Sequence, residues 1–244
     1  MATLSTQKTK TKPPKIRISN DFVYSFIKKN NQIAIKILFY LSHNIKEYPN
    51  NKDYITFRLD TKELTSFCNV DRKTLIQAFV AIQKISISFT TEKETEYFTI
   101  FPRVKDIYNG KMEIDIHHKV LEQIISIKKK YSAININNIS KIKYKHSLRM
   151  LMILENISGY NNGALPMKYF SLEELNALFG TKYTRAIYFQ NKILQKIKDD
   201  LDNLSDLSFV HNPVYEKTNI KQGRAKMIGF RIFPNKNKPR PTLF

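Results

Sequence analysis

Hydrogen-bonding and basic side chains follow one face of a helix that the apolar spacing predicts over residues 183–204. At 100° per residue, apolar side chains gather on one side of this helix and polar ones on the other. Amide and basic groups of this kind can read base edges in duplex DNA. The alternative interpretation is an ordinary amphipathic helix whose polar face contacts only solvent. The polar face holds Thr184, Tyr188, Asn191 and Gln195, with Lys192 and Lys198 beside it. The apolar face holds Ala186, Phe189, Ile193, Ile197 and Leu201.

The charges at the ends of this helix are reversed relative to its dipole. Lys182 and Arg185 lie at the amino-terminal end, and aspartates between positions 199 and 202 lie at the carboxyl-terminal end. Each misplaced charge costs about 0.3–1 kcal/mol, so an external partner is expected where the basic residues gather. Phosphates would satisfy them, and the acidic end would stay away from the nucleic acid. We therefore predict that this helix, including Tyr183 at its start, contacts DNA.

Other groups of basic residues are weaker candidates. We expect phosphate contacts from a helix predicted over residues 71–84. The loop 217–226 resembles a basic wing, although a solvated hairpin tip is an equal alternative. A third group, on and before a later helix, either flanks the phosphate backbone or simply coats that helix. These groups are, in order, Arg72, Lys73, Thr74 and Gln77; Lys221, Arg224 and Lys226; and Lys141, Lys143, Lys145 and Arg149.

The chain offers no recognisable catalytic or metal motif. His117 and His118 are adjacent, so on a strand they would point to opposite faces and could not form the one-faced pair that rolling-circle nicking enzymes need. The single cysteine, Cys68, is expected to be a buried small hydrophobe rather than a catalytic thiol. Glycine-rich phosphate loops are absent from the sequence. We therefore expect no enzyme activity, no cofactor and no metal.

The composition favours a folded, strongly basic protein. The 244 residues suffice for one or two domains, 42% of them are hydrophobic, and the formal net charge is +20. So large a positive charge indicates a polyanionic partner. The first residues lack the apolar segment of a signal peptide, and the apolar stretch 33–41 is too short to span a bilayer. A cytoplasmic protein without membrane contact is expected.

The elements that position these residues occur in two similar sets. The first set is a helix over 33–48, a strand around 55–59, a capped helix start at 60–64, a helix over 71–84, and alternating runs at 85–89, 97–104 and 112–116. The second set is a helix over 143–157, a capping box from Ser171 to Glu174, the helix over 183–204, and strands at 207–210 and 227–233. Helix, short helix, turn, helix and β-ribbon is the order of a winged helix.

An offset of 111 residues, as between Glu63 and Glu174, aligns the two sets and indicates an internal duplication. With this offset Leu75 meets Ala186. The predicted fold class is therefore α+β, with two tandem winged-helix domains related by duplication. We expect a flexible basic arm over 1–15, an N-terminal domain over 16–136, a C-terminal domain over 137–234 and a basic tail over 235–244.

These motifs resemble the initiator Rep proteins of iteron-containing, theta-replicating plasmids (the RepA/RepE type), over about residues 16–234. The segment 144–151 is similar to the long helix of that family, and 170–180 is similar to its capped helix. Tyr183 and the segment 189–194 resemble its recognition segment, and 207–210 and 228–232 its closing strands. Where the family tends to have Lys-Arg-Arg, this chain has Gln190-Asn191-Lys192, so that only Lys192 matches in charge.

The resemblance implies a non-enzymatic initiator of a bacterial cytoplasm that binds direct repeats (iterons) of a plasmid origin in double-stranded DNA and promotes opening of the origin. It further implies recruitment of host replication proteins, including the replicative helicase, and a homodimer that represses the protein's own gene. Two alternatives stay open. One is a winged-helix transcriptional regulator without a replication role, and the other is a rolling-circle nicking enzyme, which the missing histidine pair disfavours.

Overall fold

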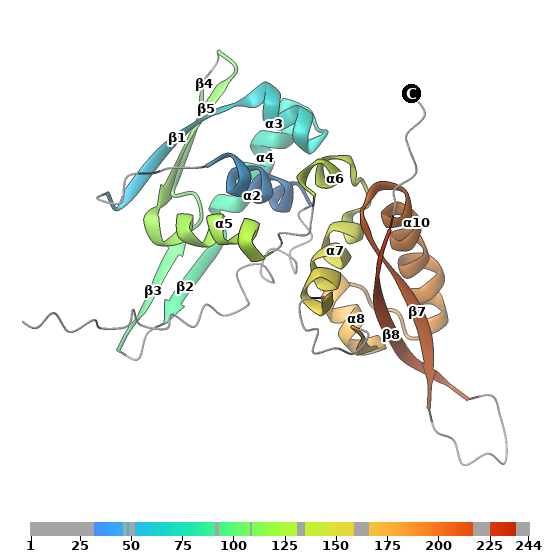
Figure 1. Cartoon of the computed structure of the whole chain (residues 1–244). Coiled ribbons are helices and arrows are strands. Elements are labelled where there is room, and N and C mark those ends of the chain that lie inside the picture. The colour runs from blue at the N-terminus through green and yellow to red at the C-terminus, as the bar shows by residue number, and fades with distance from the viewer. Residues whose placement is uncertain are drawn as a thin grey trace, which may run out of the picture.

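The computed structural model describes residues 32–45, 48, 52–90, 93–107, 109–130, 135–158, 166–216 and 225–237. Two lobes lie side by side, and a short helix, α6, lies between them (Figure 1). Each lobe combines helices with an antiparallel three-stranded sheet. The predicted α+β class with two winged-helix units is confirmed. Within the described residues, no helix has both the length and the apolar character needed to cross a bilayer.

The first lobe builds its sheet from strands that are far apart in sequence. The order in this sheet is β1-β5-β4, and β2 and β3 pair separately as a two-stranded ribbon that projects from the lobe (Figure 1). The elements are α2 (Gln32–Asn44), β1 (Tyr54–Asp60), α3 (Thr61–Cys68), α4 (Arg72–Gln83), β2 (Ser86–Thr90), β3 (Thr95–Thr99), β4 (Arg103–Ile107), β5 (Lys111–His117) and α5 (His118–Lys130).

The second lobe repeats this plan without the ribbon. Its sheet order, β6-β8-β7, matches that of the first lobe strand for strand. The elements after α6 (Ile136–Lys141) are α7 (Lys145–Ser158), β6 (Lys168–Ser171), α8 (Leu172–Phe179), α9 (Ala186–Phe189), the π-helical segment η1 (Gln190–Leu194), α10 (Gln195–Leu204), β7 (Leu207–Tyr215) and β8 (Met227–Lys236). The three helical segments from α9 to α10 follow one another without a break.

The predicted offset of 111 residues holds at the ends of the paired short helices α3 and α8. Asp60 caps α3 by accepting hydrogen bonds from the amides of Lys62 and Glu63, and Ser171 caps α8 in a complete capping box. Both helices end on a left-handed residue, Asn69 with φ 56° and Gly180 with φ 63°. Only glycine and asparagine adopt this conformation readily, so the sequence marks both turns.

The turn after α8 is longer than the one after α3, which corrects the predicted start of the helix over 183–204. Asp71 caps α4, but the cap of α9 is Arg185, so the helix begins at Ala186. The side chain of Asn176 holds the extra turn: its Oδ1 accepts hydrogen bonds from the Thr181 hydroxyl (2.7 Å) and the Tyr183 amide (3.0 Å), and its Nδ2 donates to the Tyr183 carbonyl (2.8 Å).

The expected single strand over 97–104 is wrong. It is divided between β3 and β4, which belong to different sheets. The chain leaves one sheet for the other because Ile100 and Phe101 between them are fully buried, and the ring of Phe101 packs 5.5 Å from that of Phe79. A buried apolar pair anchors the crossover, and an alternating pattern by itself does not reveal it.

Three elements were not predicted: α5, α6 and β6. The buried side chains of α5 do have helical spacing, at Val120, Leu121, Ile124 and Ile127, so the signal was present. The tail expected from residue 235 begins later, because β8 continues to Lys236. The side chain of Asn237 then donates to the carbonyls of Leu201, Asp202 and Ser205. The arm over 1–15 lies outside the described residues.

Helix α6 connects the lobes through hydrogen bonds to both. The buried Lys36 of α2 donates from Nζ to the carbonyl of Ser140 (2.8 Å), and Gln32 donates to the carbonyl of Ile142 (2.9 Å). On the other side, Asn138 donates to the carboxylate of Asp206 (3.1 Å). Burial lowers the pKa of Lys36. These bonds hold the two lobes in a defined relative position.

Candidate nucleic-acid interface

The polar face of α9, η1 and α10 lies on the surface, as predicted. Tyr188, Asn191, Lys192 and Gln195 are exposed, and so are Thr184 and Arg185, which lie just before the helix begins; Tyr188 retains 49% of its accessible surface. The predicted apolar face is buried in full, at Ala186, Phe189, Ile193, Ile197 and Leu201. We call Lys182, Arg185, Tyr188, Asn191 and Lys192 the α9 front. This surface is open to a partner.

The basic residues of the α9 front carry unneutralised charge. Within the described residues, no carboxylate forms an ion pair with Lys182, Arg185 or Lys192. The guanidinium of Arg185 instead stacks on the ring of Tyr188, 5.2 Å from its centroid. One of its N–H groups also donates to the Tyr188 hydroxyl at 3.4 Å, and the remaining donors leave Arg185 oriented but still able to bind an anion.

Tyr183 differs from the other predicted contacts because it is only half exposed. Its ring packs edge-on against Phe189, with the centroids 5.9 Å apart. Its backbone amide and carbonyl are both held by Asn176. Tyr183 therefore fixes the turn that presents Lys182 and Arg185.

The segment η1 places Asn191 and Lys192 on a widened turn of the helix. In a π-helix each turn accommodates an additional residue, so the face that points outward changes along the chain. The consecutive residues Ile193 and Leu194 are both buried here, while Asn191 and Lys192 are both exposed. The wider turn brings an amide and an ammonium group to the surface side by side.

Two aspartates at the acidic end of the same helix, Asp199 and Asp202, have partners within the protein. Asp199 accepts a hydrogen bond from Gln195 (2.8 Å), and Asp202 accepts from Lys198 (2.6 Å) and from the hydroxyl of Ser208. At the basic end, by contrast, Lys182, Arg185 and Lys192 have no carboxylate partner among the described residues. Gln195, predicted to contact DNA, already has an intramolecular partner.

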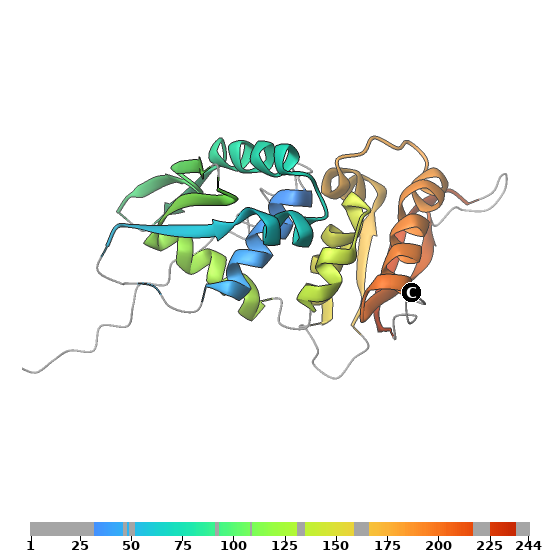
Figure 2. The same ribbon diagram turned by 90° about the horizontal axis from the view of Figure 1, so that it is seen from above.

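In the first lobe, helix α4 presents the predicted residues, with one difference. Lys73 and Gln77 are exposed, but Arg72 donates to Asp106 of β4 at 2.7 Å. Seen from above, α4 lies along one edge of the molecule, and the start of α9 reaches the same edge (Figure 2). The two predicted contact surfaces thus face a common side.

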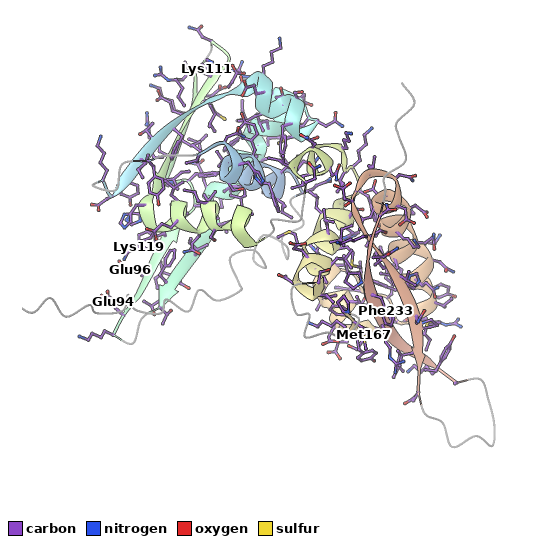
Figure 3. The ribbon with its side chains drawn as sticks, viewed as in Figure 1. Glu94, Glu96, Lys111, Lys119, Met167 and Phe233 are labelled. Carbon is purple, nitrogen blue, oxygen red and sulfur yellow. The ribbon has the colours of Figure 1, made fainter. Side chains whose placement is uncertain are left out.

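The hairpin β4–β5 of the first lobe carries basic residues that sequence reasoning missed. Lys111 lies at its tip (Figure 3) and pairs with Asp60 at 3.0 Å. Arg58, on the neighbouring strand β1, pairs with Glu113 (2.8 Å), and Arg103 of β4 lies 3.3 Å from Asp115. The residues of these ion pairs are 12 to 55 positions apart in the sequence, so no short sequence pattern reveals the pairing. In this lobe most of the basic side chains near the sheet are already neutralised.

The wing of the second lobe is described only at its base. Lys221 and Arg224 lie outside the described residues. Lys226 is exposed, and its carbonyl accepts a hydrogen bond from the Glu216 amide (2.8 Å), which closes the base of the β7–β8 hairpin. Lys141, Lys143 and Lys145 are exposed near the start of α7.

The suggestion that Arg149 coats the surface is wrong. Arg149 is 2% exposed, donates from Nη1 to the carbonyl of Leu178 near the end of α8, and lies 5.7 Å from the ring centre of Phe179. Burial lowers its pKa to about 10. Because helical ends leave carbonyls without internal donors, Arg149 joins α7 to the end of α8.

The two adjacent histidines do not point to opposite faces of a strand, so that prediction is also wrong. Strand β5 ends at His117 and α5 begins at His118. The change of backbone conformation brings the two rings together, with centroids 4.5 Å apart. Cys68 is 3% exposed, as expected for a small core residue, and burial raises its pKa to about 12.

Similarity to one solved structure supports the fold. One solved structure, described as the Pi initiator protein in complex with iteron DNA, matches with a TM-score of 0.63 and 12% identity, covering 91% of this chain and 98% of that one. A second, of domains 2 and 3 of RctB, matches with a TM-score of 0.47 and 9% identity, covering 89% of this chain and 82% of that one. A search of curated proteins finds no match.

Two family models match consecutive parts of the chain. The model described as "Initiator Replication protein, WH1" matches residues 15–155, which is more than half of the chain. The model described as "Initiator Rep protein, WH2" matches residues 171–232, which include α8, α9 and α10. The chain therefore belongs to the family of replication initiator proteins with two winged-helix domains.

Proposed function

We propose that the protein initiates plasmid replication by binding direct repeats of an origin through both lobes. The observation that carries this proposal is the α9 front, an exposed set of basic and amide side chains without carboxylate partners among the described residues. Phosphates satisfy such unpaired cations, and Asn191 and Lys192 have the chemistry to read base edges. The Pi initiator, which shares the fold, was solved with iteron DNA.

The two lobes define the length of the expected binding site. Helix α4 and the start of α9 reach the same edge of the molecule (Figure 2). Recognition elements on one side of a duplex enter successive major grooves about 34 Å, or roughly 10 base pairs, apart. We therefore propose a site of about two helical turns per chain, with α9 reading bases and α4 contacting mainly phosphates.

A footprint tests this arrangement. The full chain is titrated onto a duplex that contains the direct repeats beside its gene, and the protected length is measured by hydroxyl-radical cleavage. Protection on one side of the duplex over about two turns is expected. Protection of a single turn would show that only one lobe engages the DNA.

Salt dependence provides a second test. Neutralising about 6–10 phosphates gives a log–log slope of binding constant against salt of roughly −5 to −9. A slope near zero would contradict the proposed interface. Comparison of a repeat-containing duplex with a scrambled one separates sequence-specific binding from general attraction to phosphate.

The steps after binding are also part of the proposal. We propose that binding promotes origin opening and recruits host replication proteins, including the replicative helicase, and that a homodimer represses the protein's own gene. The action is non-enzymatic and needs no cofactor. A plasmid that carries only the gene and its flanking repeats should replicate autonomously in a bacterial host. Binding without replication would favour the alternative, a transcriptional regulator.

A further inference from the structure

A cluster of potential metal ligands lies at the end of the first-lobe sheet, away from the α9 front. Asp53, His117 and His118 place one ligand atom each within 4.8 Å of one another. Asp53 precedes β1, His117 ends β5 and His118 begins α5. Because β1 and β5 pair with Tyr54 opposite His117, the fold brings residues from distant parts of the chain to one place.

The surrounding structure holds this cluster in position. The amide of His118 donates to the carbonyl of Asp53 at 2.9 Å. The ring of His117 packs against Tyr54 at 5.1 Å and Phe98 at 4.3 Å between centroids. A site whose ligands are already ordered loses little conformational entropy when an ion binds.

We propose that Asp53, His117 and His118 bind one divalent transition-metal ion, with zinc the best fit. Two imidazoles and one carboxylate form a ligand set that zinc accepts, with water in the fourth position. Magnesium and calcium prefer oxygen ligands throughout, so the two nitrogens disfavour them. Asp53 is exposed and His118 half-buried, which gives the ion a path to the site.

The neighbouring charges are compatible with a cation. The ammonium of Lys119 would repel a metal ion, but it forms an ion pair with Glu96 of β3 (Figure 3). It also lies over the ring of Phe98. The carboxylate of Asp53 likewise disfavours an anion at the start of α5, where a helix would otherwise attract one.

Coordination of the ion by His117 would break one local hydrogen bond. Nδ1 of His117 accepts from the amide of Lys119 at a long 3.3 Å, and a neutral imidazole has a single nitrogen with a free lone pair. Coordination therefore replaces this bond or moves the ring proton to Nδ1. The Lys119 amide belongs to the first turn of α5, whose amides have no partner within the helix, so water can take its place.

Binding would join the start of β1, the end of β5 and the start of α5. Helix α5 packs along α2, which also carries the contacts to α6. An ion that binds only the folded protein raises the stability of the first lobe, and the gain grows with the logarithm of the free ion concentration once this exceeds Kd. The inferred role is structural and is independent of the proposed DNA-binding function.

The test uses the full chain after treatment with a chelator. Zinc is titrated by isothermal calorimetry and in competition with a chromophoric chelator. Binding of one equivalent at micromolar zinc is expected. His118→Gln and Asp53→Asn should each weaken binding by at least about tenfold, since each removes one ligand. His43→Gln, on α2 and outside the cluster, should bind zinc like the unaltered chain.

A stability measurement separates loss of the site from loss of the fold. In chelator, the variants should melt at the same temperature as the unaltered chain and bind duplex DNA equally well. Zinc should raise the melting temperature of the unaltered chain and of His43→Gln, but not of Asp53→Asn. Failure of the unaltered chain to bind zinc, or equal binding by His118→Gln, would overturn the proposal.

Discussion

The two lobes share one architecture but differ in how their basic residues are used. Both have the same sheet order and the same capped short helix, in register with one another. In the first lobe, Arg58, Arg72 and Arg103 are paired with carboxylates. In the second, the basic residues of the α9 front have no such partner among the described residues. The shared fold supplies the scaffold, and we expect the placement of carboxylates to make the second lobe the stronger site for an anion.

This difference predicts an unequal division of binding energy. A surface ion pair contributes only about 0–1 kcal/mol to stability, so a phosphate can replace a carboxylate as partner. The net gain in binding free energy is smaller in the first lobe, however, because each arginine there loses a carboxylate partner when it acquires a phosphate. We therefore expect the second lobe to dominate affinity and the first lobe to set register.

The largest expected difference between the lobes concerns acid stability. The equivalent positions Ile35 and His146 are both buried, but only the second titrates. Burial lowers the pKa of His146 to about 4, against 6.5 in the unfolded chain. The folded state therefore favours the neutral imidazole of His146. The stability that depends on this neutral ring is fully present above pH 6.5 and is lost as the pH falls towards 4. The free energy of unfolding falls by about 3 kcal/mol over this range.

Urea unfolding as a function of pH measures this effect. In His146→Ile, which copies the first lobe, the decline in stability between pH 6.5 and 4 should be much shallower. Some decline should remain, because burial also lowers the pKa of His117 and of His211. Identical pH profiles for the variant and the unaltered chain would show that His146 is not the titrating group.

The second prediction concerns DNA binding. Arg185→Ala and Lys192→Ala should each weaken binding to the repeats by about 1–3 kcal/mol if these residues contact bases. Arg72→Ala in the first lobe should cost less, since Arg72 is already paired with Asp106. Fluorescence anisotropy on repeat and scrambled duplexes provides the measurement. Equal losses on both duplexes would assign Arg185 and Lys192 to phosphates, and a larger loss for Arg72→Ala would reverse the proposed ranking.

The third prediction compares the caps of the paired helices. Ser171→Ala and Asp60→Ala should each lower the free energy of unfolding by about 0.5–2 kcal/mol, because each leaves first-turn amides without an acceptor. Ser158→Ala serves as the control, since the Ser158 hydroxyl donates to the Leu154 carbonyl within α7 and, among the described residues, accepts from no first-turn amide. Urea denaturation should show little change for the control. If only one of the two cap substitutions lowers the free energy of unfolding, the two helices are not equivalent.

The smallest effect is expected from freeing a cation in the first lobe. Asp106→Asn releases Arg72, so duplex affinity should rise by up to about 1 kcal/mol and the salt slope should steepen by about one. Glu122→Gln on α5 removes the same charge from an exposed side chain that forms no ion pair among the described residues. If both variants bind alike, the gain reflects net charge and not the release of Arg72.

Local signals in the sequence predicted much of the fold. The caps at Asp60 and Ser171 and the left-handed turns at Asn69 and Gly180 depend on residues within one helical turn, so they are visible in the sequence. The exposed and buried faces of α9 and α10 follow from helical periodicity in the same way. The extra turn before Ala186 was missed because Asn176, several positions earlier, determines it.

The sequence by itself determined the two repeated units, their capped helices and the polar face that begins near Tyr183, since these depend on neighbours along the chain. Only the tertiary structure decided that Arg149 is buried, that Arg72 is paired with Asp106, and that Asp53 meets His117 and His118. The physical reason is that charge pairing and ligand clustering depend on distance in space. Strand pairing and helix packing set those distances between residues that the sequence keeps far apart.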